Sequence, residues 1–268
     1  KMPTARPQRI FVFLLSFIAC VVYASVATSA DWQATLQQGD ELYNKRYESS
    51  GEKDVTASIK KYEEALKGIP ESDKKAQLDV YIKLSRAYFT LADVFAKEDD
   101  AQSEFSNEGQ DWAEKALDID DDSAAAHYWM GTNLGVWRGV NRVSFRGGLG
   151  GGGIMKEFEE AAELDPKGLD GMPYMRMAEF SMAKNNLEEA KKYAEEAVKI
   201  QPKLLKNKLI LAEALWKNED KAGSKKLLED ISSQPDNILP NAILENRVAI
   251  KAAKRVLQGI AGGGTPDW

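Results

Sequence analysis

The chain has 268 residues, of which 43% are hydrophobic and 29% charged, enough for one or two globular domains with sizeable cores. Its formal net charge is −6, with acidic residues and lysines interleaved along most of the sequence. A uniformly acidic chain is a poor candidate for binding nucleic acid or anionic membranes, so we expect no nucleic-acid partner.

Residues 1–30 are typical of a secretory signal peptide. Three basic residues, Lys1, Arg6 and Arg9, precede the apolar run "FVFLLSFIACVV" (11–22), and the small residues "ASVATSA" (24–30) follow it. The run is short for a transmembrane helix. We therefore expect cleavage after Ala30 or Ala27 and a periplasmic protein.

Cys20, the only cysteine, lies inside this segment. The alternative interpretation is a lipoprotein anchored through Cys20, although the preceding "FIA" fits poorly, because Leu usually stands three residues before such a cysteine. Without Cys20 the exported chain has no disulfide, no cysteine nucleophile and no cysteine metal ligand.

Five segments further along the chain share one amphipathic form with a small residue near the end. They cover residues 59–70, 110–121, 155–166, 190–202 and 223–235. Three of them close with a proline five residues after an alanine, at Pro70, Pro166 and Pro202. Proline ends a helix and sets the turn to the next element.

A second helix with a small residue in its middle precedes each of these segments. These helices are expected at 32–43, 79–95, 126–137, 174–183 and 208–216, and their small residues are Gly39, Ser85, Gly131, Ala178 and Ala212. The pattern resembles the tetratricopeptide repeat (TPR), W-x₂-L-G-x₂-Y, then A-x₃-F, then P, over residues 32 to about 235. The resemblance implies an all-α, right-handed superhelix of about five helix pairs.

The expected domains are a signal peptide (1–30), a repeat domain (31–258) and a disordered tail (259–268). A final helix at 240–257 is interpreted as the terminal cap of the superhelix. The first three units have long connections, including 44–55, 96–109 and the glycine run 147–153, which form either loops or helix extensions.

The sequence offers few of the side chains and motifs that catalytic sites require. The only histidine, His127, occupies the consensus Trp position and faces its partner helix, so we interpret it as a packing residue. "GGLGGGGIMK" (147–156) lacks the G-x-x-x-x-G-K-[ST] spacing of a phosphate loop. We therefore expect no enzyme, no cofactor and no metal site.

Two interpretations of the glycine run stay open. The run is either a connecting loop without a functional role or a mobile rim beside a cavity. Arg138, Arg142 and Arg146 precede the run. They either bind an anionic ligand or are solvated loop charges.

The first helices of stacked pairs line the inner side of a superhelix, so binding residues are sought there. Positions −3, +1 and +4 from each small residue share one helix face and mix aromatic, methionine and isolated charged side chains, as ligand or peptide sites do. The candidates are Leu36, Asp40, Tyr43, Ile82, Arg86, Phe89, Tyr128, Thr132, Met175, Glu179, Met182, Leu209, Glu213 and Trp216. The alternative is that aromatic members such as Phe89 and Trp216 belong to the core.

Residues 113–137, "AEKALDIDDDSAAAHYWMGTNLGVW", and 154–180, "IMKEFEEAAELDPKGLDGMPYMRMAEF", are similar to the periplasmic T component of TRAP (tripartite ATP-independent periplasmic) transporters. The chain departs from that group at "MPYMRMAEF", where "RALG" is expected. The resemblance implies a cavity, self-association into a homo-oligomer, contact with a periplasmic substrate-binding protein and a small organic ligand.

The other functional hypothesis is an envelope scaffold that docks peptides or helices. A closed, mostly apolar cavity beside Tyr128 favours a small ligand, whereas an open groove favours a peptide.

Overall fold

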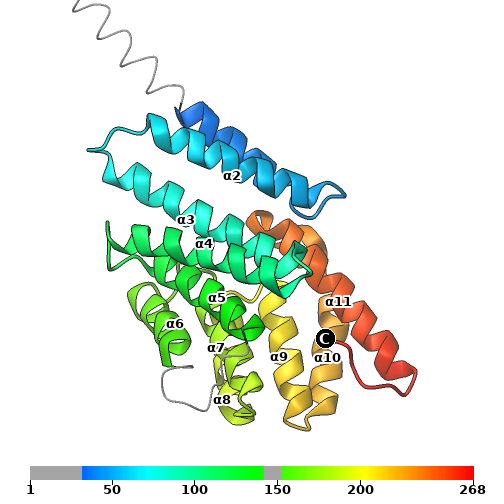
Figure 1. Ribbon diagram of the computed structural model, residues 1–268. Helices are drawn as coiled ribbons and strands as arrows, with labels where there is room; N and C mark the ends of the chain where they lie inside the picture. The colour runs from blue at the N-terminus through cyan, green and yellow to red at the C-terminus, as the bar shows by residue number, and fades with distance from the viewer. Residues whose placement is uncertain (1–31, 142–151) are drawn as a thin grey trace, which may run out of the picture.

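The structure is a computed structural model that describes residues 32–141 and 152–268, and every regular element in these two ranges is helical (Figure 1). A first helix covers residues 32–43. It is followed by α2 (Gly51–Gly68), α3 (Lys74–Thr90), the π-helical turn η1 (Leu91–Phe95), α4 (Asp99–Leu117), α5 (Ala124–Val140), α6 (Gly152–Leu164), α7 (Met172–Ala183), α8 (Leu187–Ile200), α9 (Leu205–Lys217), α10 (Lys221–Ser233), the short turns η2 (Asp236–Ile238) and η3 (Pro240–Ala242), and α11 (Ile243–Ala261).

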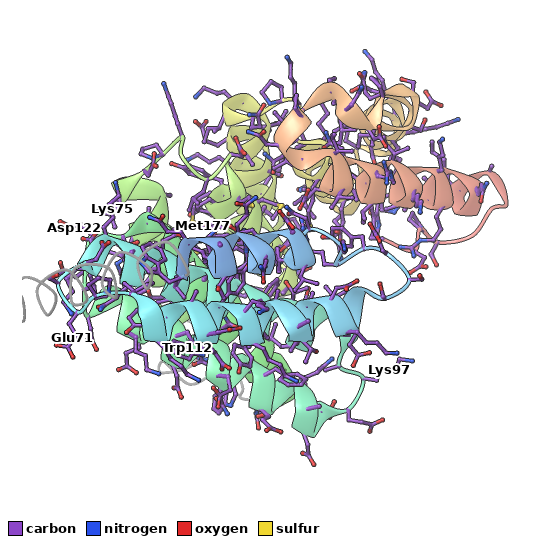
Figure 2. All side chains as sticks on the ribbon, turned by 90° about the horizontal axis from the view of Figure 1, so that it is seen from above. Glu71, Lys75, Lys97, Trp112, Asp122 and Met177 are labelled. Carbon is purple, nitrogen blue, oxygen red and sulfur yellow. The ribbon has the colours of Figure 1, made fainter. Side chains whose placement is uncertain are left out.

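These helices form the five predicted pairs: helix 32–43 with α2, α3 with α4, α5 with α6, α7 with α8, and α9 with α10. The connections lie at alternate ends of the stack. In Figure 2, Glu71 and Asp122, in the turns before α3 and α5, lie at one end, while Lys97, before α4, lies at the other. The chain is therefore a superhelix of antiparallel helix pairs.

The small residues in the first helices let the two helices of a pair approach closely. A Cβ atom added to Gly39 would lie 2.5 Å from Tyr62 Cε1 of α2, and one added to Gly131 would lie 2.7 Å from Phe158 Cε1 of α6. In α3 the equivalent Ser85 donates its hydroxyl to the Gly109 carbonyl oxygen of α4 at 2.7 Å. A larger side chain at these positions would force the helices apart.

The long connections of the first two units are mostly helix extensions. α2 begins at Gly51 and α4 at Asp99, so each second helix starts well before its repeat motif. The glycine run lies outside the described residues except for Gly152 and Gly153, which begin α6.

Buried asparagines tie neighbouring pairs together. Asn133 of α5 donates to the Ser85 carbonyl oxygen at 3.3 Å and to Ser85 Oγ at 3.1 Å. Asn207 of α9 donates to the Asp170 carbonyl oxygen at 2.9 Å, and Asn246 of α11 accepts from the Leu205 backbone N–H at 2.8 Å. These bonds satisfy backbone groups that the packing removes from water, and they fix the register between units.

The cap helix α11 closes the C-terminal end of the stack. Its buried residues Ala249, Ala253 and Val256 form one cluster with Leu205 of α9 and Leu228 of α10. α11 extends to Ala261, and Trp268 packs against the same cluster. None of the helices in the described ranges has the length and hydropathy needed to span a bilayer.

α11 also reaches the first unit. Arg46, in the connection before α2, donates a hydrogen bond to the Glu245 carboxylate at the start of α11, across 199 residues of sequence. The Arg46 guanidinium stacks on Tyr43 and Tyr47, with its Cζ 4.7 and 4.8 Å from the ring centroids. In Figure 1 the start of α11 lies beside this N-terminal connection. The first unit and the C-terminal cap helix therefore contact each other here.

Gly131→Ala should lower the free energy of unfolding by about 1–3 kcal/mol, because the new methyl group meets Phe158. Gly135→Ala, one turn along the same helix, should raise it by about 0.5–1 kcal/mol, because its Cβ has nothing within 4 Å and alanine favours the helix. Urea denaturation of both variants measures the difference. Two changes of the same sign would contradict the close-approach account.

Arg46→Gln and Glu245→Gln should show a coupling free energy of about 1–2 kcal/mol in a double-mutant cycle, because their contact is partly buried. The exposed pair Lys61–Glu64 is the control and should couple by less than about 0.5 kcal/mol. Equal coupling free energies in the two pairs would contradict the expectation that the partly buried Arg46–Glu245 contact contributes more to stability than an exposed ion pair.

Candidate functional site on the inner face

Some of the first helices contact one another along the stack. α3 contacts α5, α7 contacts α9, and α9 contacts α11. Contacts between first helices make them the shorter, inner side of the curve, as the sequence predicts. Residues on this side are the candidates for a binding surface.

A hollow of ≈ 290 Å³ opens on the inner face between α5 and α7, and it is open to solvent rather than enclosed. Its walls are mainly apolar, with charged groups at one edge. The lining residues are Phe89, Asp93, Gly131, Thr132, Gly135, Val136, Ile154, Phe158, Arg176, Glu179, Phe180 and Ala183.

The end of α3 supplies one wall of the hollow. After Thr90 the helix widens into the π-helical turn η1, which carries Asp93 to the hollow's edge. π-Helical turns are rare and often occur at functional sites. Phe89, one turn earlier, packs on Trp129 of α5 with 5.7 Å between the ring centroids.

α7 supplies the charged edge. It begins after Gly171, whose φ of +76° and close approach to the Ala197 carbonyl oxygen require glycine. Arg176 donates to Glu179 Oε2 at 2.7 Å, and the Arg176 Cζ lies 5.2 Å from the Phe89 ring centroid. The two charged side chains are 18% and 29% exposed, so the pair is recessed but reachable.

Burial and neighbouring charges set the ionisation of this edge. Burial alone would raise the pKa of Glu179, but the positive charges of Arg176 and Lys206 outweigh it and hold that pKa below its usual value. The pKa of Lys206, in the first turn of α9, is lowered by burial and then by the Arg176 charge. The edge therefore carries an ionised Arg176–Glu179 pair beside the Lys206 side chain, whose charged form is disfavoured by burial and by the Arg176 charge.

Glu213, also on α9, shows the opposite shift. Burial raises the pKa of Glu213 above its usual value, although the nearby Lys217, 3.5 Å away, partly offsets this.

The structure places the predicted residues in two groups. Those at +1 and +4 of α3, α5 and α7 include Phe89, Thr132 and Glu179, which line the hollow together. Residues at −3, such as Tyr128 and Met175, are buried in clusters with the second helices instead. On α7 the hollow is also lined by residues outside the predicted positions, namely Arg176, Phe180 and Ala183.

The remaining predicted residues lie elsewhere on or below the inner face. Leu36, Tyr43 and Met182 pack in core clusters, and Leu209 packs against the α11 cluster. Asp40 forms an ion pair with Lys83 at 2.8 Å, while Arg86 stacks on Tyr43 with 4.1 Å from its Cζ to the ring centroid. Ile82 and Trp216 are half-buried. Whether these side chains bind a partner stays a prediction.

Of the three predicted rim arginines, Arg138 lies half-buried in the last turn of α5, where its guanidinium is next to Gly153. Arg142 and Arg146 lie outside the described residues, so the alternatives for the glycine run stay open.

His127 has two hydrogen-bond partners. Its Nδ1 lies 2.7 Å from Glu157 Oε2 of α6, and its Nε2 lies 2.9 Å from the Asp121 carbonyl oxygen. This agrees with a packing histidine facing the partner helix. Within residues 32–141 and 152–268, no three His, Cys, Asp or Glu side chains are grouped so that they could hold a metal ion.

Sequence reasoning missed Arg176, Asp93 and Lys206. Arg176 carried a usable signal, because it is an isolated charge in the apolar stretch "YMRMAEF". Asp93 reaches the hollow only through the π-helical turn, and Lys206 stands six residues before Ala212, outside the repeat motif.

Comparison with solved structures shows which fold this is. The structure of TTC0263, a thermophilic TPR protein from Thermus thermophilus, superposes with a TM-score of 0.59 at 15% identity, covering 83% of this chain and 98% of that one. The chain has the tetratricopeptide-repeat fold. Two structures of MamA give lower TM-scores of 0.45 and 0.44 at 17% and 16% identity, with 81% and 83% of this chain and 96% and 94% of theirs covered. The fold assignment rests on the first comparison.

Sequence comparison adds one partial match. The family model "Regulator of microtubule dynamics protein 1-3" is similar to residues 35–167, just under half of the chain. No curated protein matches the sequence.

Glu179→Gln and Glu213→Gln should change the pH dependence of stability in opposite directions. The lowered pKa of Glu179 gives the wild type stability that is present above the usual value of 4.5 and is lost as pH falls through the lower, folded-state pKa. Glu179→Gln should therefore be less stable than the wild type at pH 7, with the gap closing in acid.

The raised pKa of Glu213 means that its charge costs stability above that pKa, so Glu213→Gln should gain stability over the wild type as pH rises from about 4 to 7. Urea denaturation between about pH 3 and 7 measures both variants. Parallel pH profiles would contradict the two assigned pKa shifts.

Proposed function

We propose that this protein is a non-enzymatic interaction module that docks an extended or helical peptide segment of a partner on its inner face. The observation that carries the proposal is the open hollow of ≈ 290 Å³ between α5 and α7, with apolar walls and a charged edge. The tetratricopeptide-repeat fold supports a scaffold role, because stacked helix pairs present an extended concave surface to partners.

The shape of the hollow favours a peptide over a small organic ligand. Small-molecule sites enclose about 300–1,000 Å³ and bury most of the ligand. This hollow lies at the lower limit of that range and is open to solvent. Tyr128, which the sequence places beside a possible closed cavity, is instead packed among Trp129 and Phe158.

The partial family match agrees with a docking role. The matched residues 35–167 include α3, α5 and α6, which form three walls of the hollow, and the family's name, a regulator of microtubule dynamics, is consistent with action on another protein. Export to the periplasm, the lipid-anchor alternative, self-association and an accessory role in a TRAP transporter remain predictions from the sequence.

Filling the hollow should weaken docking without unfolding the chain. Gly135→Leu places a side chain where the structure has open space, so peptides selected from a random library on the full chain should bind this variant at least about tenfold more weakly. Gly139→Leu is the control, because Gly139 also has open space on α5 but does not line this hollow. Isothermal titration calorimetry measures both affinities.

Unchanged affinity in Gly135→Leu would place peptide docking elsewhere and overturn the proposal. Failure to select any peptide that binds the wild-type chain would overturn it as well.

A further inference from the structure

The charge of this protein is segregated between two helices. Residues 97–122, which contain α4 and its flanking turns, hold eleven acidic residues against two lysines. α11 holds four basic residues and a single acid, Glu245, which pairs with Arg46. The modest formal net charge of −6 over the whole chain is therefore the sum of one strongly acidic helix and one strongly basic helix, among others.

The acidic side chains of α4 form one exposed stripe. They recur every three or four residues, which is the spacing of a single helix face, at Asp100, Glu104, Glu108 and Asp111. None of these carboxylates forms an ion pair with any residue in the ranges that the structure describes. Burial, and then the charges of nearby carboxylates that include Glu108 and Glu104, raise the pKa of Tyr88 to about 12. Like charges at this spacing destabilise a helix, so a cationic partner would stabilise α4.

The basic side chains of α11 form a second exposed stripe with the same helical spacing. Its members are Arg247, Lys251, Lys254 and Arg255. Arg247 and Arg255 are 53% and 56% exposed, and each is near one surface carboxylate, at 2.9 and 3.6 Å. Lys251 and Lys254 form no ion pair with a described residue. Val248, which is 46% exposed, lies beside them and adds an apolar contact to the stripe.

The two stripes match in length and lie apart on the molecule. α4 and α11 each have 19 residues. Figure 2 shows α11, in pale red, on one side of the molecule, whereas Trp112 of α4 lies on the other side. α4 packs on α3 and α5, while α11 packs on α9 and α10. The two stripes therefore compensate each other only when they belong to different molecules.

We infer that α11 of one copy of this chain docks along α4 of a second copy. Opposite charges steer the two stripes together and fix their orientation. Because each copy offers one α4 and one α11, the contact is heterologous and joins the copies head to tail. Neither stripe lines the hollow between α5 and α7, so this assembly does not depend on the proposed docking function. An anionic lipid surface, which the basic stripe would also attract, is the competing outcome.

Sedimentation velocity of the purified protein over a concentration series tests the contact. At low salt the mean mass should rise with concentration. It should return to that of the monomer at about 1 M salt, where the screening length falls to about 3 Å.

Reversing the charge of either stripe should weaken association by at least about tenfold, because it places like charges opposite each other. One variant combines Lys251→Glu with Lys254→Glu, and the other combines Glu104→Lys with Glu108→Lys. Mixing the two variants should restore association, because the reversed α11 matches the reversed α4 and the unchanged stripes match as well.

The control reverses two exposed lysines of α8, with Lys192→Glu and Lys199→Glu combined, and should leave association unchanged. Circular dichroism melts of each variant exclude loss through unfolding.

A wild-type protein that stays monomeric at every concentration overturns the proposal. Association that survives both reversals, or that the mixture of variants does not restore, overturns it as well. Monomeric protein that binds phosphatidylglycerol vesicles, and loses that binding with Lys251→Glu and Lys254→Glu, assigns the basic stripe to a lipid surface instead.

Discussion

The close approach of two helices at a small residue is the constraint on which the rest of this structure depends. Where Gly39 meets Tyr62 and Gly131 meets Phe158, no Cβ atom fits between the helices. The tight pairs then stack through contacts between each second helix and the next first helix, with further contacts between α3 and α5 and between α7 and α9. Stacked pairs of this kind curve and present one inner face. The hollow, the charged edge on α7 and the position of α9 all follow from this curvature.

The inner face combines groups that a purely structural surface would keep apart. The Arg176–Glu179 pair is recessed beside phenylalanine side chains, where poor solvation strengthens electrostatic interactions. The contact of Arg46 with Glu245 joins the first unit to α11 and limits how far the superhelix can open. A surface held in this way is preorganised for binding, which lowers the conformational entropy lost when a partner binds.

The sequence predicted the helix pairs because small residues and closing prolines mark local packing that repeats along the chain. It also predicted that Phe89, Thr132 and Glu179 share one face, since helical spacing determines that relation. It did not separate the −3 positions, because the tilt that buries Met175 against α8 depends on how neighbouring pairs stack. The contact between Arg46 and Glu245 joins residues too distant in sequence for any local pattern to indicate.

A crystal structure of the chain with a library-selected peptide tests the central claim most directly. The account predicts peptide density on the inner face between α5 and α7, with a large apolar side chain against Phe89 and Phe180. Density on the outer face, against second helices such as α4 or α8, would contradict it.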